Sequence, residues 1–138
     1  MLYSGKQAHI HLAGGDANTG YRIHKLQLFA QLPGAASQES VVKIYQDKQT
    51  SVDGTVDFGD DTLLASAYLL NHLTATDNPA YMFAIFDNEH INQDIYITHA
   101  DVKNGNTNIN YYLELEEFKM NDSEVAVVNY KAALLHGE

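Results

Sequence analysis

The 138-residue sequence predicts one all-β domain spanning residues 1–138, an antiparallel β-sandwich of the jelly-roll-like kind. Short segments with apolar and polar residues in alternation indicate strands with one buried face. Turn residues separate these segments at intervals of roughly 8–12 residues, the spacing typical of sandwiches. The sequence contains no internal repeat and no linker, and 45% of its residues are hydrophobic, which provides for a single core.

The first long strand is expected at residues 21–32, before the Pro33-Gly34 turn signal. Alternation divides its side chains between two faces. We expect the more apolar face to carry His24, Leu26, Leu28, Ala30 and Leu32. The wetter face would then carry Ile23, Lys25, Gln27, Phe29 and Gln31.

The middle of the chain predicts three further elements. Residues 41–45 are rich in β-branched side chains and favour a strand. Asp53-Gly54 is typical of a turn, and residues 55–58 after it predict a short strand. Residues 63–70 form an apolar run that fits either a helix or a buried strand, and periodicity does not separate the two.

Two more strands are predicted at residues 81–86 and 94–98, joined by a polar connection at residues 87–93. Residues 102–106 contain an Asn-Gly turn signal and lead into an alternating segment at residues 109–118. We therefore expect the last two of these strands to pair as a hairpin.

The carboxyl end predicts a helix. Asn121 and Glu124 have the spacing of a capping box. Apolar residues then recur at helical spacing, namely Val125, Val128, Ala132 and Leu135. The alternative is a further edge strand, because residues 125–128 also favour β structure.

The charge balance excludes several classes of partner. Eighteen acidic and eight basic residues give a net charge of −10, which disfavours binding to nucleic acid and to anionic membranes. The absence of cysteine excludes disulfides and thiolate chemistry. The first residues lack the pattern of a signal peptide, so we expect the protein to be made and folded in a cytoplasm.

His9 and His11 are the most conspicuous candidate metal ligands, because residues i and i+2 of a strand share one face. A metal site requires a third ligand, and no other histidine has a matching spacing. A cupin-like site would require a glutamate shortly after His11, and none is present. The sequence therefore predicts no metal site.

Two acidic clusters are also interpreted as non-catalytic. Asp53, Asp57, Asp60 and Asp61 lack the spacing of a calcium-binding loop and indicate a solvated loop. Glu114 and Glu116, with Glu117 beside them, fit the charged outer face of a strand whose inner face is leucine. Because no nucleotide-binding or nucleophile motif occurs, we predict a protein without catalytic residues or cofactors, not an enzyme.

Three stretches of the sequence together resemble a known group of proteins. They are residues 56–65, residues 85–97 and residues 110–116, followed by a tail at residues 123–131. They are similar to small virion proteins encoded by marine tailed bacteriophages. The resemblance covers residues 26–131, and its middle stretch is the most specific.

The resemblance implies a structural component of a phage particle. With the acidic charge, which opposes a place beside packaged DNA, it suggests a capsid decoration (cement) protein on the outer surface of the head. Its partners would be the major capsid protein or other virion proteins, and copies of itself. A tail, neck or fibre subunit is the alternative, and a cupin-like metal- or carbohydrate-binding protein is an alternative of a different class.

Residues expected to contact partners lie in three predicted loops or ends. The polar connection contributes His90, Ile91, Asn92 and Gln93, and the amide-rich turn contributes Asn104 and Asn106. Tyr3 belongs to the amino-terminal segment, residues 1–12, which we expect to be able to add a strand to a neighbouring subunit.

Overall fold

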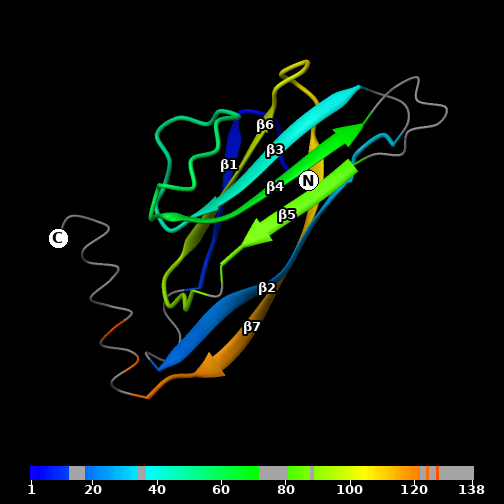
Figure 1. Cartoon of the computed structure of the whole chain (residues 1–138). Helices are drawn as coiled ribbons and strands as arrows, with labels where there is room; N and C mark the ends of the chain where they lie inside the picture. The colour runs from blue at the N-terminus through cyan, green and yellow to red at the C-terminus, as the bar shows by residue number, and fades with distance from the viewer. Residues whose placement is uncertain are drawn as a thin grey trace.

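The computed structural model describes residues 1–12, 18–33, 37–71, 81–87, 89–121, 124 and 127 (Figure 1). The described part of the chain contains seven strands: β1 (Lys6–Ile10), β2 (Thr19–Ala30), β3 (Gln38–Tyr45), β4 (Leu63–Asn71), β5 (Tyr81–Phe86), β6 (Ile95–Asp101) and β7 (Ile109–Lys119).

The seven strands form two antiparallel sheets that pack against each other. One sheet has the order β1-β6-β3-β4-β5, and the other pairs β2 with β7 as a long ribbon (Figure 1). The chain crosses between the sheets after β1, after β2 and after β6. The predicted antiparallel β-sandwich is therefore confirmed.

The core lies between the sheets and is built by alternation along each strand. Val42, Ile44, Ile95 and Ile97 point inward from β3 and β6 with no exposed surface, and the ribbon contributes Ile109. Each such aliphatic side chain contributes about 1.5–3 kcal/mol when it is buried. The inward faces of the five-stranded sheet and the ribbon thus supply one continuous core.

A β-bulge in β2 changes part of the predicted alternation. The register shifts between Ile23 and Lys25, so that His24 is an extra residue opposite β7. Ile23 is consequently buried and His24 is exposed, the reverse of the prediction, whereas Leu26 is buried as predicted. Leu32 was also predicted on the buried face, but it lies beyond the end of β2 and is 54% exposed.

The structure decides between helix and strand for one segment and contradicts the strand predicted for another. Residues 63–70 belong to strand β4, so the apolar run is a strand rather than a helix. The strand predicted at residues 55–58 is wrong, because this segment joins no sheet. The Thr55 carbonyl instead accepts a hydrogen bond from Nζ of Lys43, at 2.5 Å, which attaches the segment to the outside of the sandwich.

The hairpin predicted at residues 102–106 is also wrong. β6 pairs with β1 and β3, whereas β7 pairs with β2 in the other sheet. The turn itself exists, and Gly105 has the positive φ of 80° that a glycine adopts without strain. The turn is therefore a corner between the two sheets, which local sequence signals do not distinguish from a hairpin turn.

At the carboxyl end, the Asn121 side chain accepts a hydrogen bond from the Glu124 N–H at 2.9 Å. The Asn121 amide in turn donates to the Glu124 carboxylate at 2.8 Å. Glu124 and Val127 both have helical backbone. The rest of the helix predicted here lies outside the described residues. No helix of the described chain is long and apolar enough to span a membrane.

Candidate binding surface

The outer face of the five-stranded sheet is divided into a covered half and an uncovered half. Residues 46–62, which we call the covering loop, lie over β3 and β6 and reach as far as β1 (Figure 1). Gln7 of β1 exchanges two hydrogen bonds with Gln49 of this loop, at 2.8 and 3.3 Å. Val41 and Lys43 point outward from β3, yet both are buried beneath the loop.

Lys43 holds the covering loop in place through its buried ammonium group. The ammonium donates to the Thr55 carbonyl and to the Asp53 carboxylate, the latter at 3.3 Å. The pKa of Asp53 is lowered by the N–H of Thr55 and then by Lys43. A buried charge requires such partners, so the loop and the strand stabilise each other.

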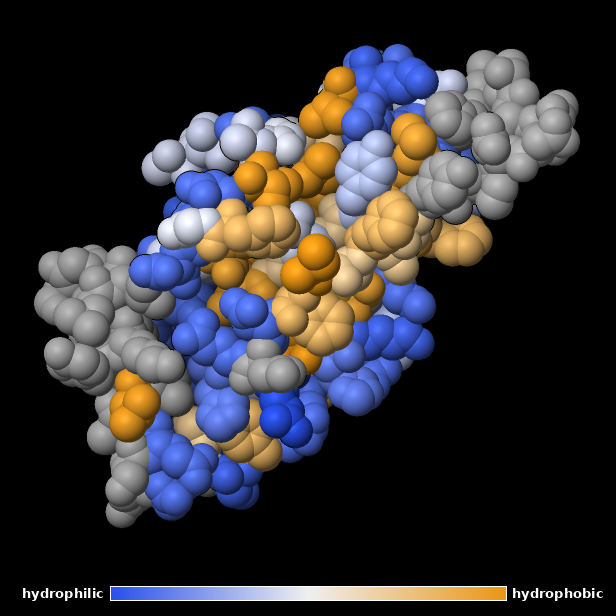
Figure 2. Space-filling model, viewed as in Figure 1, coloured by the Kyte–Doolittle hydropathy of each residue, from blue (hydrophilic) through white to orange (hydrophobic). Residues whose placement is uncertain are grey.

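The uncovered half carries large apolar side chains that face solvent. Alternation along β5 sends Met82, Ala84 and Phe86 toward the core. It leaves Phe83 and Ile85 pointing outward, 63% and 61% exposed. Figure 2 shows apolar side chains gathered over β4 and β5.

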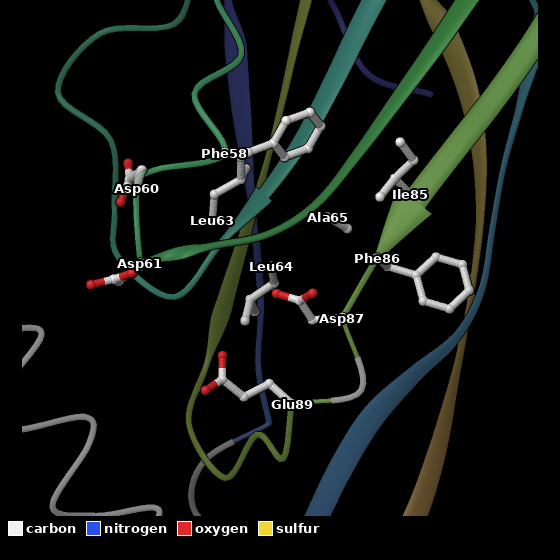
Figure 3. A pocket seen from close by; sticks show the side chains of 10 residues that line it. All are labelled: Phe58, Asp60, Asp61, Leu63, Leu64, Ala65, Ile85, Phe86, Asp87 and Glu89. Atoms are coloured by element: carbon white, nitrogen blue, oxygen red, sulfur yellow. The ribbon is translucent and has the colours of Figure 1, made fainter.

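A groove beside this strand continues the apolar surface. Its volume is about 540 Å³, and Phe58, 69% exposed, closes one side of it (Figure 3). The groove is lined by Phe58, Asp60, Asp61, Leu63, Leu64, Ala65, Ile85, Phe86, Asp87 and Glu89. We call Phe58, Phe83 and Ile85 the exposed apolar strip, because Ile85 both lines the groove and lies beside Phe83 on one face of β5.

Carboxylates surround the groove from two directions. Asp60 and Asp61 approach from the covering loop, and Asp87 and Glu89 follow the end of β5 (Figure 3). An apolar floor with an acidic rim suits a partner that presents apolar and cationic groups together. The sequence did not predict this surface, because it requires residues from the loop and from two strands to meet.

Three of the four aspartates of the predicted acidic loop accept hydrogen bonds from the backbone of the loop itself. Asp53, Asp57 and Asp60 each accept the N–H of the residue two positions later, at 2.8–3.0 Å. These bonds shape the turns of the covering loop. Within the described ranges, the carboxylates of this loop belong to no cluster with metal-binding geometry.

The predicted contact residues of the polar connection are only partly available to a partner. Ile91 is 4% exposed and pairs with Tyr21 through two backbone hydrogen bonds, at 2.6 and 2.7 Å. It fills the core, so its prediction as a contact residue is wrong. His90 is half-buried with its ring 4.4 Å from that of Phe118, and Asn92 and Gln93 are also half-buried.

The other predicted contacts lie elsewhere on the molecule. Tyr3 is 57% exposed, and Asn104 and Asn106 are exposed in the corner between β6 and β7; none of the three lines the groove. Asn104 also donates to the carbonyl of Ser37. The structure therefore does not bring the predicted contact residues together into one surface.

The amino-terminal segment is part of the chain's own fold. Leu2 is 5% exposed and pairs with Ile109, and β1 is already hydrogen-bonded to β6. One edge of β1 is thus already paired within the chain. Because β1 lies at the edge of its sheet, its other edge is where it could pair with a strand of a neighbour, and that expectation stays a prediction.

The outer face of the ribbon is charged, as predicted from Glu114 and Glu116. Arg22 forms two hydrogen bonds with Glu116, both at 3.0 Å, and His24 lies 3.6 Å from Glu114. The hydrogen bonds from Arg22 lower the pKa of Glu116. These carboxylates face basic partners on β2, which gives them a structural role.

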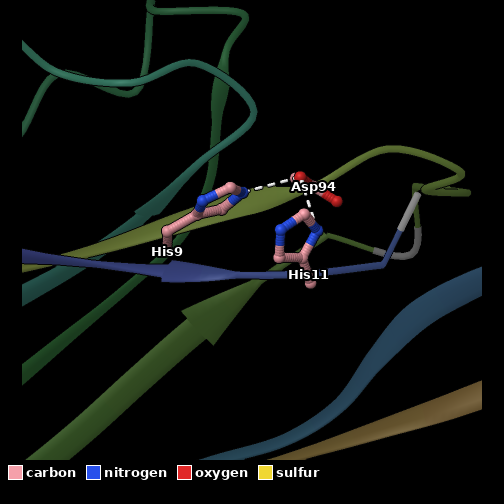
Figure 4. Close-up of side chains that lie close together, drawn as sticks. All are labelled: His9, His11 and Asp94. Atoms are coloured by element: carbon pink, nitrogen blue, oxygen red, sulfur yellow. Dashed lines mark hydrogen bonds and ion pairs between the residues drawn. The ribbon is translucent and has the colours of Figure 1, made fainter. Parts of the chain in front are cut away.

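His9 and His11 do have a third neighbouring ligand, and the sequence interpretation missed it. His9 Nε2 lies 2.6 Å and His11 Nδ1 lies 3.2 Å from Oδ2 of Asp94 (Figure 4). β1 and β6 pair with Ile10 opposite Ile95, so the next pair brings His11 opposite Asp94. Pairing of these two strands was the missing information, because Asp94 lies 83 residues after His11 (94 − 11).

Comparisons of the chain with family models, with curated proteins and with solved structures found no match.

Proposed function

We propose that this chain is a structural phage virion protein, a decoration (cement) protein that binds the outer surface of the head and stabilises it. The observation that carries the proposal is the exposed apolar strip, Phe58, Phe83 and Ile85, on the uncovered half of the sheet. The sequence resemblance supplies the identity of the partner, the coat lattice. No cofactor enters the proposal.

The strip has the composition of a docking surface. Aromatic side chains bury about 150–250 Å² each and supply most of the energy of many interfaces. Phe83 also pairs across the sheet with Tyr68, which lies next to it on the same face. A modest patch is sufficient for a lattice protein, because many equivalent sites are presented together and neighbouring copies can contact one another.

The acidic rim adds specificity to this surface. Asp60, Asp61, Asp87 and Glu89 would meet lysine or arginine residues around an apolar patch of the coat. The net charge of −10 opposes a location beside packaged DNA. The charge therefore favours the outside of the particle.

A tail, neck or fibre subunit remains the rival within the same class. Its docking surface would have the same chemistry, so the number of copies discriminates the two. The cupin-like alternative is disfavoured by geometry, because His9 and His11 lie on the outer face of the sheet. A cupin-like site would place its ligands between the sheets.

The copy number per particle tests the proposal. Purified particles separated on a gel should contain the chain at on the order of hundreds of copies, in fixed ratio to the coat protein, because a decoration protein follows the lattice. About six or twelve copies per particle would indicate a neck or tail subunit instead. Absence from the particle would contradict a virion role.

A further inference from the structure

We infer that His9, His11 and Asp94 form a binding site for one divalent transition-metal ion, with Zn²⁺ as the ion that suits it best. The inference rests on side-chain geometry at the β1 edge of the sheet and does not depend on the proposed virion role. Neither the covering loop's carboxylates nor the groove contributes to this site.

Strand geometry places all three ligands on one face. His9 and His11 are two residues apart and therefore point to the same side of the chain. Gln7 and His9 lie opposite Thr98 and Tyr96, so this side is the outer face of the sheet. Asp94 enters the same face from the chain just before β6 (Figure 4).

The ligand atoms are already close to metal-binding positions. One ring nitrogen of His9, one of His11 and one Asp94 oxygen lie within 4.8 Å of one another. Tetrahedral zinc with bonds of about 2.0–2.2 Å separates its ligand atoms by roughly 3.3 Å. The distance of 3.2 Å between His11 and Asp94 matches this value, and the 2.6 Å hydrogen bond of His9 would open by less than about 1 Å.

Neighbouring groups hold the ligands in orientation. Oδ1 of Asp94 accepts the N–H of Leu12 at 2.8 Å, which turns Oδ2 toward the two imidazoles. The ring of His9 stacks on Tyr96 with a centroid distance of 4.8 Å and an interplanar angle of 16°. Such supporting contacts reduce the cost of organising a metal site.

The ligand set selects the class of ion. Two imidazoles and one carboxylate suit Zn²⁺ and its first-row neighbours, whereas Ca²⁺ and Mg²⁺ prefer oxygen ligands alone. The side chain of His11 is 78% exposed and that of His9 is 43% exposed. The fourth position would therefore face solvent and hold water.

Zinc titration of the full chain tests the inference. Chelator-treated protein at neutral pH is titrated with Zn²⁺ by calorimetry, and bound zinc is measured after desalting. We expect one zinc per chain, with affinity reduced at least about tenfold in Asp94→Asn, because the carboxylate ligand is lost. Asparagine retains the oxygen that accepts the Leu12 N–H, so this variant should remain folded.

Two further variants complete the design. His11→Ala should also weaken zinc binding. Because the His11 side chain is exposed, the substitution should leave the protein folded, so weaker binding would report the loss of a ligand. His24→Ala is the matched control, because His24 is an exposed histidine on the other sheet, beside Glu114, and its removal should leave zinc binding unchanged. The inference would be overturned if the wild type bound no zinc. It would also be overturned if Asp94→Asn and His11→Ala both bound zinc as tightly as the wild type.

Discussion

His99 shows how one buried polar residue organises an end of the core. Its side chain points inward from β6 and has no exposed surface. Nδ1–H donates to the Leu2 carbonyl at 3.0 Å, and Nε2 accepts the Ser40 hydroxyl at 2.7 Å. The Ser40 oxygen in turn accepts the Gln38 amide at 2.7 Å. This chain of bonds attaches the amino-terminal segment to the middle of the sheet.

The neutral form of His99 is the one that fits this network. Burial lowers the pKa of His99, and this effect exceeds the raising contributions of the Leu2 carbonyl and Asp101. The unfolded chain therefore binds a proton more readily, with a pKa of about 6.5. The stability from this residue is complete above that pKa and decreases as the pH falls below it.

We predict that His99→Leu destabilises the protein by about 2–4 kcal/mol, because the Leu2 carbonyl and the Ser40 hydroxyl lose a buried partner. Urea unfolding measures this change. As the pH falls from 7.5 to 5.5, protonation of His99 in the unfolded chain should lower the free energy of unfolding of the wild type by up to about 1.4 kcal/mol per pH unit. The variant has no histidine at this position and should lack this contribution. Equal pH slopes for the two proteins would contradict the assigned neutral histidine.

At the scale of elements, the corner between β6 and β7 depends on Asp101. Its carboxylate accepts the N–H groups of Glu39, Lys103 and Thr107 at 3.1–3.3 Å. Burial raises the pKa of Asp101, but these hydrogen bonds together outweigh it and hold the pKa below its ordinary value. The ionised carboxylate therefore stabilises the turn that sends the chain from one sheet to the other.

We predict that Asp101→Asn lowers the free energy of unfolding by about 2–3 kcal/mol at pH 7, because the N–H groups of the asparagine amide would face backbone N–H donors. Since the folded pKa is lowered, the wild type retains this stability above the unfolded pKa of about 3.9 and loses it as the pH falls through the folded value. The difference between the proteins should therefore shrink at pH 3. Asp61→Asn, an exposed control, should change stability little; a constant Asp101→Asn penalty at both pH values would refute the argument.

Strands were predictable where alternation or β-branched residues dominate. The strand at residues 81–86 coincides with β5, and β3 contains the strand predicted at residues 41–45. The bulge at His24, the loop at residues 55–58 and the corner near Gly105 depend on partners distant in the sequence. Local patterns contain no information on such partners. For the same reason, the sequence did not indicate that Asp94 lies beside His9 and His11.

At the scale of the whole molecule, the covering loop determines which surface is left for a partner. By lying over β3 and β6, it buries Lys43 and Val41 but leaves β5 uncovered. The outward side chains of β5 are consequently apolar and exposed, beside a groove with acidic walls. One face of the sandwich thus combines exposed apolar side chains with neighbouring carboxylates, and the proposed docking rests on this combination.

Binding of this face to the outside of the head can be measured directly. Heads lacking the protein are incubated with purified chain, and bound copies are counted by sedimentation and gel. The wild type should bind in fixed ratio to the coat protein, and Phe83→Ser/Ile85→Ser should reduce its affinity at least about tenfold. Phe29→Ser, at a 67% exposed site on the ribbon, is the matched control and should bind like the wild type. Failure of the wild type to bind would contradict the decoration role, and undiminished binding of the double variant would contradict docking through this face.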